Sequence, residues 1–451
     1  MDVKRLMLVL HKYIFNETDH LYLKTLYSFN SIIMKRLKFF IPVFFLLLSA
    51  IVQAQTTKEE FLSDVKHAGG IYHSYDYVHT PATPAPKGYK PFYISHYGRH
   101  GSRWLTDSRN YTRPYNILSD AHKANRLTTL GESLYERVKI VAKDAEDRYG
   151  DLSPLGVLEH RGIAERMFRS FPEVFSTRNG RKCYIYSRST VVPRCILSMA
   201  ANNERLKELN PEIVITREST NRNSYLNDRY GAVNKDSIAT VCNNFLKKHF
   251  NSEHFISTLF TDSVYTKEHI DNPLTLARDI FAMAADLQDL DYLNISMFDV
   301  FSKDDIFTLW QESNLRIYGD FTSKGAMESS KSLLKNILDC ADNAIKNGNV
   351  SADLRFGHDS YITPLITFMD IKGLNGKESD PEKVYQVWSN YKVTSMGANL
   401  QLIFYKNDKM GDIIVKLLHC EKEVELPVST DIAPYYHWKD FKAYYEKKLT
   451  E

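Results

Sequence analysis

Short apolar runs bounded by polar turns predict the strands of a protein that contains both helices and sheet. Aromatic and β-branched residues dominate residues 91–96 (PFYISH) and 183–187 (CYIYS), and residues 353–356 (DLRF) form a third run. Two further runs, residues 399–405 (NLQLIFY) and 412–418 (DIIVKLL), are separated by a polar turn. This spacing predicts a hairpin.

Apolar positions at helical spacing predict helices between these strands. Ser153 followed by Pro154 predicts a helix start, because Ser is a good N-cap and Pro suits the first helical position. We expect this helix to run to about Phe171. Apolar residues recur at every fourth position from Leu333 to Ile345, and Gly348 predicts the end of that helix.

The middle of the chain has a different character. Between about residues 200 and 330 the strand signals thin out, and helical stretches such as residues 273–287 dominate. We therefore expect an α/β fold with a mixed, mostly parallel central sheet flanked by helices and a large α-helical insertion, or cap, domain. Residues 55–199 and 331–451 are assigned to the core, and residues 200–330 to the cap.

The N-terminal region predicts export. Residues 34–54 have the layout of a secretory signal peptide: a basic start, an apolar run from Phe39 to Ile51 and small residues ending at Ala54. The apolar run is shorter than the ~20 residues of a membrane span. We expect cleavage after Ala54, no membrane span in the mature chain, and a periplasmic or extracellular location. Residues 1–33 fit no part of a signal peptide and are interpreted as an over-long N-terminal extension.

Charge and cysteine content narrow the function classes. Residues 1–54 hold seven of the 58 Lys/Arg and three of the 55 Asp/Glu, so the remainder has a net charge of −1. No global field attracts a polyanion, and we expect no nucleic-acid partner. The five cysteines are widely spaced and form no zinc pattern. We interpret most of them as buried apolar residues, although one disulfide remains an alternative.

Residues 95–104 (SHYGRHGSRW) carry the strongest chemical signal, directly after a predicted strand. Arg99 and Arg103 flank His100, and the planar guanidinium group suits phosphate oxygens. A histidine held between two cations resists protonation and stays nucleophilic. Gly101 would allow the backbone to approach a ligand closely.

Two alternatives compete with a phosphate site. The segment could be a solvated basic loop with a chance histidine. His96 and His100 could also bind a metal, but their spacing suits this only on a helix, which Gly98 and Gly101 disfavour.

Four segments together resemble the histidine acid phosphatases, a family that includes phytases and multiple inositol polyphosphate phosphatases. Residues 99–103 (RHGSR) resemble the motif R-H-G-x-R of that family. The other segments occur in the expected order, and the likeness spans about residues 90–440: residues 152–162 (LSPLGVLEHRG), 188–194 (RSTVVPR) and 356–365 (FGHDSYITPL).

The resemblance implies a role for each matching residue. His100 would attack phosphorus and become a phosphohistidine. Asp359 would protonate the leaving alcohol, without a metal or any other cofactor. The phosphate oxygens would be bound by Arg99, Arg103, Arg194 and His358.

Two departures from the family pattern concern these roles. The usual D-V-D before the last arginine is replaced by residues 191–193 (VVP), so Pro193 stiffens the approach to Arg194. The proton donor is Asp359, whereas the multiple inositol polyphosphate phosphatases usually have a glutamate there. In this respect the chain resembles other phytases and acid phosphatases.

The expected function is a metal-independent phosphomonoesterase for a small phosphate ester, namely an inositol polyphosphate such as phytate. A rim for further phosphates, or else a solvated charged loop, is expected from Arg109, Arg113, Lys123 and Arg126. The alternatives are a broad-specificity acid phosphatase and a catalytically inactive phosphate-ester binding protein. A mutase of the phosphoglycerate type is disfavoured by the signal peptide and the insertion. The sequence leaves the oligomeric state open.

Overall fold

A computed structural model describes residues 56–226 and 235–451 of the chain. The predicted signal peptide, residues 34–54, and the predicted extension, residues 1–33, lie outside the described residues.

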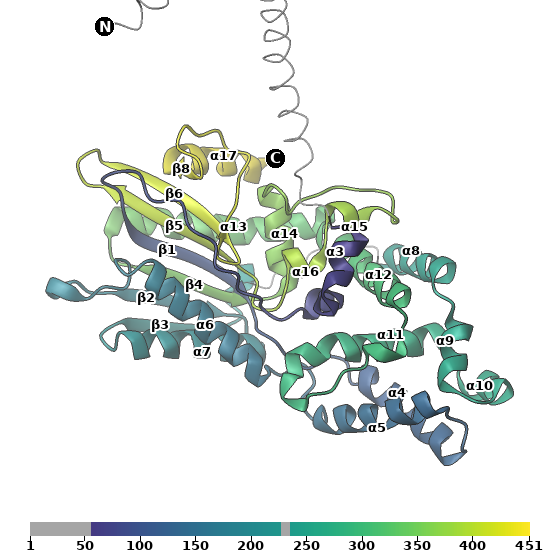
Figure 1. Ribbon diagram of the computed structural model, residues 1–451. Coiled ribbons are helices and arrows are strands. Elements are labelled where there is room, and N and C mark those ends of the chain that lie inside the picture. Colours follow the sequence, from purple (N-terminus) through teal and green to yellow (C-terminus); the bar gives the residue numbers. More distant parts are fainter. Residues whose placement is uncertain (1–55, 227–234) are drawn as a thin grey trace, which may run out of the picture. The chain divides into compact units, whose positions relative to one another are not determined.

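The predicted strands pair into one mixed sheet (Figure 1). Its order is β3-β2-β4-β1-β5-β6-β7, and β8 pairs with β6. β3, β2, β4 and β1 run parallel, whereas β5 is antiparallel to β1 and forms the predicted hairpin with β6. The strand bounds are β1 Lys90–Arg99, β2 Tyr184–Ser189, β3 Val214–Ser219, β4 Ala352–Gly357, β5 Asn399–Asn407, β6 Asp412–His419, β7 Lys422–Glu423 and β8 Tyr435–His437.

Helices follow the strands as the periodicity predicts. Ser153 caps α6 by accepting a hydrogen bond from the Gly156 amide at 3.3 Å, and Gly348 ends α13 with a φ of +60°. The α-helices are α3 Lys58–Ser63, α4 Arg109–Lys123, α5 Thr129–Asp144, α6 Pro154–Ser170, α7 Pro193–Leu209, α8 Lys235–His249, α9 Ser252–Leu259, α10 Ser263–His269, α11 Pro273–Asp286, α12 Lys303–Phe321, α13 Lys324–Asn347, α14 Asp359–Met369, α15 Val384–Val387, α16 Asn390–Val393 and α17 Trp438–Thr450. The 3₁₀ helices are η1 Val65–Tyr72, η2 Arg178–Gly180, η3 Ser224–Leu226, η4 Leu287–Leu293 and η5 Phe298–Val300.

The sheet is covered on both faces, as Figure 1 shows for α6 and α7 on one side and α13 and α14 on the other. Successive strand residues point to opposite faces. Ile94 of β1 therefore packs in the core beneath α6 and α7, and Tyr93 packs in the core beneath α13, α14 and α17. The predicted mixed sheet flanked by helices is confirmed.

A third core lies mainly between helices. It joins α4 and α5 to α8, α9, α11 and α12, with Leu134, Leu246, Ile280 and Trp310 buried among its residues. Helices from residues 109–144 thus pack with helices from residues 235–321. Because α4 and α5 follow the motif segment directly, they connect the sheet edge to this helical cluster.

Several elements, including the short strands β7 and β8, were not expected from the sequence. Residues 109–123, considered as a charged loop, form the helix α4, whose apolar face includes the buried Tyr111 and Leu118. Within residues 200–330, Val214–Ser219 form the short strand β3 at the sheet edge. Its side chains are mostly exposed, which is why the apolar pattern did not reveal it.

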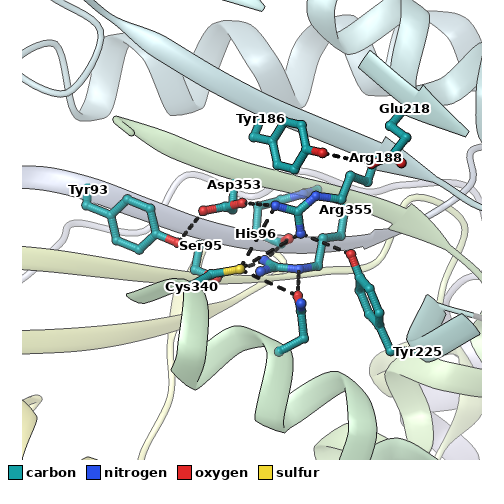
Figure 2. A network of polar contacts seen from close by, with 11 residues as sticks. Tyr93, Ser95, His96, Tyr186, Arg188, Glu218, Tyr225, Cys340, Asp353 and Arg355 are labelled. Carbon is teal, nitrogen blue, oxygen red and sulfur yellow. Dashed lines mark hydrogen bonds and ion pairs between the residues drawn. The ribbon is translucent and has the colours of Figure 1, made fainter. Parts of the chain in front are cut away.

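A buried polar network joins three parallel strands to α13 (Figure 2). Arg188 of β2 forms an ion pair with Asp353 of β4, and Tyr93 of β1 donates to the same carboxylate at 2.8 Å. Arg355 of β4 donates to Ser95 Oγ at 3.0 Å. Buried charges need such partners, so the network fixes the spacing of β2, β4 and β1.

All five cysteines are free thiols. Cys183, Cys195 and Cys242 are buried, as expected for cysteines that act as small apolar residues.

Within residues 56–226 and 235–451, every helix is too short or too polar to cross a bilayer.

Candidate active site

The candidate site lies at the carboxyl ends of three neighbouring parallel strands, β2, β4 and β1. β1 ends at Arg99, which is in register with Gly357 at the end of β4. His100 follows β1 directly and His358 follows β4, so their rings meet edge-on with centroids 5.8 Å apart. Open α/β sheets bind ligands at this edge. The topology therefore brings together motifs that are far apart in the sequence.

Two helices begin at the same edge and carry the remaining predicted residues. His358 is the N-cap of α14 and Asp359 is its first residue. Pro193 is the first residue of α7, where its missing N–H is not needed, and Arg194 follows in the first turn. Pro193, which replaces the last residue of the usual D-V-D sequence, is therefore the first residue of the helix that contains Arg194.

His100 is buried, with 1% of its surface exposed. Its Nδ1 lies 2.9 Å from the Gly101 carbonyl oxygen. A carbonyl only accepts, so Nδ1 carries the proton and Nε2 keeps its lone pair. Burial, reinforced by the charges of Arg99 and Arg103, holds the pKa of His100 well below its ordinary value of 6.5. The imidazole is thus neutral, with the lone pair of Nε2 available.

The arginines around His100 present unpaired donors. Arg99 Nη1 is fixed by the carbonyl oxygens of Ile71 and Thr394, each at 2.6 Å. The Nε atoms of Arg99, Arg103 and Arg194 are all buried and have no hydrogen-bond partner among the described residues. Buried donors normally have acceptors. A polyoxygen anion beside His100 would supply acceptors for several of them.

Asp359 lies at the same edge with Oδ2 2.8 Å from Arg99 Nη2. Burial by itself would raise the pKa of its carboxyl, but the charges of Arg99 and Arg103 outweigh burial and lower that pKa below its ordinary value. Without an anion in the pocket, Asp359 is therefore a carboxylate. It can take up a proton when another negative charge shares the arginines.

His358 completes the set of residues that the sequence predicted. Its Nε2 lies 3.2 Å from Thr190 Oγ1, which stands at the end of β2. Burial, with the charge of Arg194, lowers the pKa of His358 to about 4. The structure thus gathers Arg99, His100, Arg103, Arg194, His358 and Asp359 at one sheet edge.

The four predicted rim residues are paired with carboxylates. Their ion pairs are Arg109–Asp107 at 2.6 Å, Arg113–Asp279 at 2.8 Å, Lys123–Asp120 at 3.1 Å and Arg126–Asp262 at 3.6 Å. Arg109 and Lys123 are largely exposed. A role toward further phosphates stays a prediction.

Gly101 has a packing requirement besides the expected approach to a ligand. A Cβ atom there would lie 2.5 Å from the Gly156 carbonyl oxygen, because the start of α6 presses against the motif loop. Residue 101 must therefore lack a side chain if the loop and helix are to stay in contact.

Sequence reasoning missed several residues of the site. Tyr72 of η1 places its ring centroid 5.3 Å from the Arg103 guanidinium carbon. Ser102 contacts the buried carboxyl groups of Glu159 and Asp289. Tyr72 and Asp289 lie outside any motif, so the linear pattern held no signal for them.

The metal-pair alternative does not fit the geometry. His96 lies inside β1, where residues four apart are too far from each other to chelate an ion. Within the described ranges, residues 56–226 and 235–451, no group of three or more His, Cys, Asp and Glu side chains is arranged to hold a metal ion.

Comparison with known proteins identifies the fold. No protein-family model matches the chain, and neither does any curated protein sequence. Among solved structures, the Bifidobacterium longum multiple inositol polyphosphate phosphatase in complex with inositol hexasulfate superposes with a TM-score of 0.67 and 18% identity, over 84% of this chain and 97% of that one. Its complex with phosphate gives 0.62 and 19% identity, over 83% and 97%. The D. castellii phytase gives 0.61 and 14% identity, over 85% of each chain.

These likenesses confirm the expected fold. The chain has the fold of multiple inositol polyphosphate phosphatases and phytases, as the resemblance to the histidine acid phosphatases implied. The superposition covers most of both chains.

Proposed function

We propose that this chain is a metal-independent phosphomonoesterase that forms a phosphohistidine at His100 and acts on inositol polyphosphates. The observation that carries the proposal is the set of buried, unpartnered Nε atoms of Arg99, Arg103 and Arg194 around a neutral histidine. Three cations suit the dispersed charge of a phosphoryl group in its transition state. The fold of inositol polyphosphate phosphatases supports the substrate class.

The proposed reaction has two steps. His100 Nε2 attacks phosphorus, the P–O bond to the alcohol breaks, and Asp359 gives its proton to the departing oxygen. Asp359, now a carboxylate, then takes a proton from water, whose oxygen attacks phosphorus and breaks the P–N bond. Inorganic phosphate leaves, and both side chains return to their starting states.

The acid–base states of the two residues are compatible. The low pKa of His100 keeps its lone pair free even in acidic solution. Bound phosphate also interacts with the positive charge of Arg99, so Arg99 stabilises the Asp359 carboxylate less. The pKa of Asp359 then rises, and substrate binding itself promotes protonation of the proton donor.

Product analysis tests the substrate class. The purified mature chain is incubated with inositol hexakisphosphate or with an aryl phosphate, and released phosphate and residual inositol phosphates are followed. We expect turnover of the hexakisphosphate with a higher kcat/KM than the aryl ester. Similar kcat/KM values for both esters would indicate a broad acid phosphatase. Binding of both without release of phosphate would indicate a catalytically inactive binding protein.

We also propose that the protein acts outside the cytoplasm, on the basis of the layout of residues 34–54. N-terminal sequencing of the protein from its native host should give Gln55 as the first residue. Retention of residues 34–54 would instead indicate a tethered form.

A further inference from the structure

The hydroxyl group of Ser102 lies between two buried carboxyl groups. Its Oγ is 2.8 Å from Glu159 Oε1 and 2.8 Å from Asp289 Oδ1. Ser102 and Asp289 have no exposed surface, and Glu159 is 7% exposed. A hydroxyl carries one proton and can donate to only one of the two. The other carboxyl group must donate to Ser102 Oγ, so it holds a proton of its own.

The surrounding hydrogen bonds identify the carboxylate. Glu159 accepts from the backbone amides of Tyr75 at 2.6 Å and Ser102 at 2.7 Å. Backbone N–H groups directed at a carboxyl favour its ionised form. Burial raises the pKa of Glu159, and these bonds oppose the increase. The Ser102 proton therefore points to Glu159.

Asp289 is in the opposite situation. Among the described residues, its backbone donor is the Arg103 amide, at a long 3.4 Å. Burial, together with the charges of Asp286 and Glu159, raises the pKa of Asp289 well above its ordinary value. The hydrogen bonds and the neighbouring charges both indicate that Asp289, and not Glu159, is the protonated carboxyl group.

We propose that Asp289 is a carboxylic acid that donates to Ser102 and thereby positions the loop carrying Arg103. The proposal rests on the phosphatase function proposed above. Ser102 lies between the nucleophile segment and Arg103, and Asp289 belongs to η4 of the helical region. Asp289 does not touch the substrate and acts through Ser102, so it is a positioning residue. In this arrangement Asp289 donates a hydrogen bond to Ser102, and Ser102 donates one to Glu159.

The charged groups around Asp289 determine what its ionisation would do. Asp286 faces it from the end of α11, Glu159 from α6, and Arg103 from the loop, while Arg99 acts on it from β1. A second negative charge beside Ser102 would repel Glu159 and leave the hydroxyl with two competing acceptors. The loop and Arg103 would then shift away from the bound phosphate.

The sign of the pH dependence follows from the raised pKa. A carboxyl with a raised pKa is protonated at acidic pH and loses its proton as the pH rises. The positioning of Arg103 is therefore intact in acid and is lost toward alkaline pH. Affinity for phosphate should decrease on the alkaline side for a reason separate from the proton donor Asp359.

Variants at residue 289 test the proposal through the competitive inhibition constant of inorganic phosphate, measured across pH. In Asp289→Asn, the amide can donate to Ser102 but cannot ionise. We expect an inhibition constant within about twofold of wild type in acid and a smaller rise toward alkaline pH. Asp289→Ala removes the donor and should raise the constant about tenfold in acid, with a smaller difference from wild type toward alkaline pH.

Infrared spectroscopy provides a readout independent of turnover. A protonated carboxylic acid has a carbonyl band distinct from that of carboxylates. Wild type at mildly acidic pH should show such a band from Asp289, and Asp289→Asn should lack it. Glu159→Gln should retain it, and Asp286→Asn identifies any contribution from the neighbouring carboxyl.

The outcomes separate this inference from the proposed function. Equal weakening of phosphate binding in the Asn and Ala variants, or no band that depends on residue 289, would overturn the role of Asp289. If wild type hydrolyses no phosphate ester, the proposed function fails. The infrared experiment and phosphate titration by calorimetry then still decide whether Asp289 is protonated and positions Arg103.

Discussion

Arg99 and Asp359 form an ion pair across the ends of β1 and β4, with Nη2 2.8 Å from Oδ2. One member is predicted to bind phosphate and the other to donate a proton. A bound phosphate competes with Asp359 for the same guanidinium group. Because that competition raises the pKa of Asp359, the pair couples occupation of the site to protonation of the acid.

Asp359→Asn should separate substrates by their leaving groups. The amide keeps the size of the side chain but cannot donate a proton to an alkoxide. We expect hydrolysis of inositol phosphates to slow by about 100-fold or more, and hydrolysis of aryl phosphates, which need little help to leave, by less than about tenfold. The ratio of the two rates in mutant and wild type is the measurement. An equal loss on both substrates would remove Asp359 from the proton-donor role.

The turnover rate should have an acidic optimum. The pKa of His100 lies well below 6.5, so the nucleophile remains neutral as the pH falls through that value. The proton donor must be protonated, and the protonated form of Asp359 becomes rarer as the pH rises, because the pKa of this carboxyl is lowered in the free enzyme. A neutral His100 and a protonated Asp359 are therefore present together only in acid. A kcat profile that rises from acidic to neutral pH would contradict this assignment.

His100→Ala should abolish turnover without unfolding the chain. We expect kcat to fall at least about a thousandfold, because no other group replaces the nucleophile. Rapid acid-free quenching of wild type with labelled substrate should trap acid-labile phosphate on the protein. Circular dichroism serves as the control for folding. Substantial residual activity in this variant would rule out the phosphohistidine mechanism.

Chelators should leave the activity unchanged. The proposed chemistry uses the cations Arg99, Arg103 and Arg194 where other phosphatases use metal ions. The measurement is the rate after prolonged dialysis against a chelator, with and without added divalent ions. A loss that a divalent ion restores would mean that the reaction class is wrong.

The residues of the site that could be predicted are those whose function is local. His100 and its flanking arginines lie within one short segment, and the helix start at Ser153 follows from capping preferences. Five of the sheet strands were predictable because aromatic and branched residues gather in them, whereas the mostly exposed β3 carries no such signal.

The remaining residues depend on contacts between distant parts of the chain. Asp289 reaches Ser102 across 187 residues of sequence, and neither residue type signals the contact. Tyr72 similarly meets Arg103 only because η1 packs against the helical cluster. The ion pairs of Arg113 and Arg126 could not be anticipated either, because their partners, Asp279 and Asp262, come from distant parts of the chain.

The ion pair between Arg188 and Asp353 provides a test of what holds the site's strands together (Figure 2). Their side chains are 7% and 3% exposed, so Asp353→Asn leaves the Arg188 charge buried without its carboxylate. Removing one partner of a buried pair costs about 3–5 kcal/mol of unfolding free energy.

Tyr93→Phe is the matched control, because it removes only one hydrogen bond to the same carboxylate, at a cost of about 1 kcal/mol. Denaturant unfolding at constant pH measures both variants. Because β2 and β4 lead directly into Thr190 and His358, Asp353→Asn should weaken phosphate binding as well, whereas Tyr93→Phe should not. If both variants lose the same small free energy, the sheet spacing depends on apolar packing and not on this charge pair.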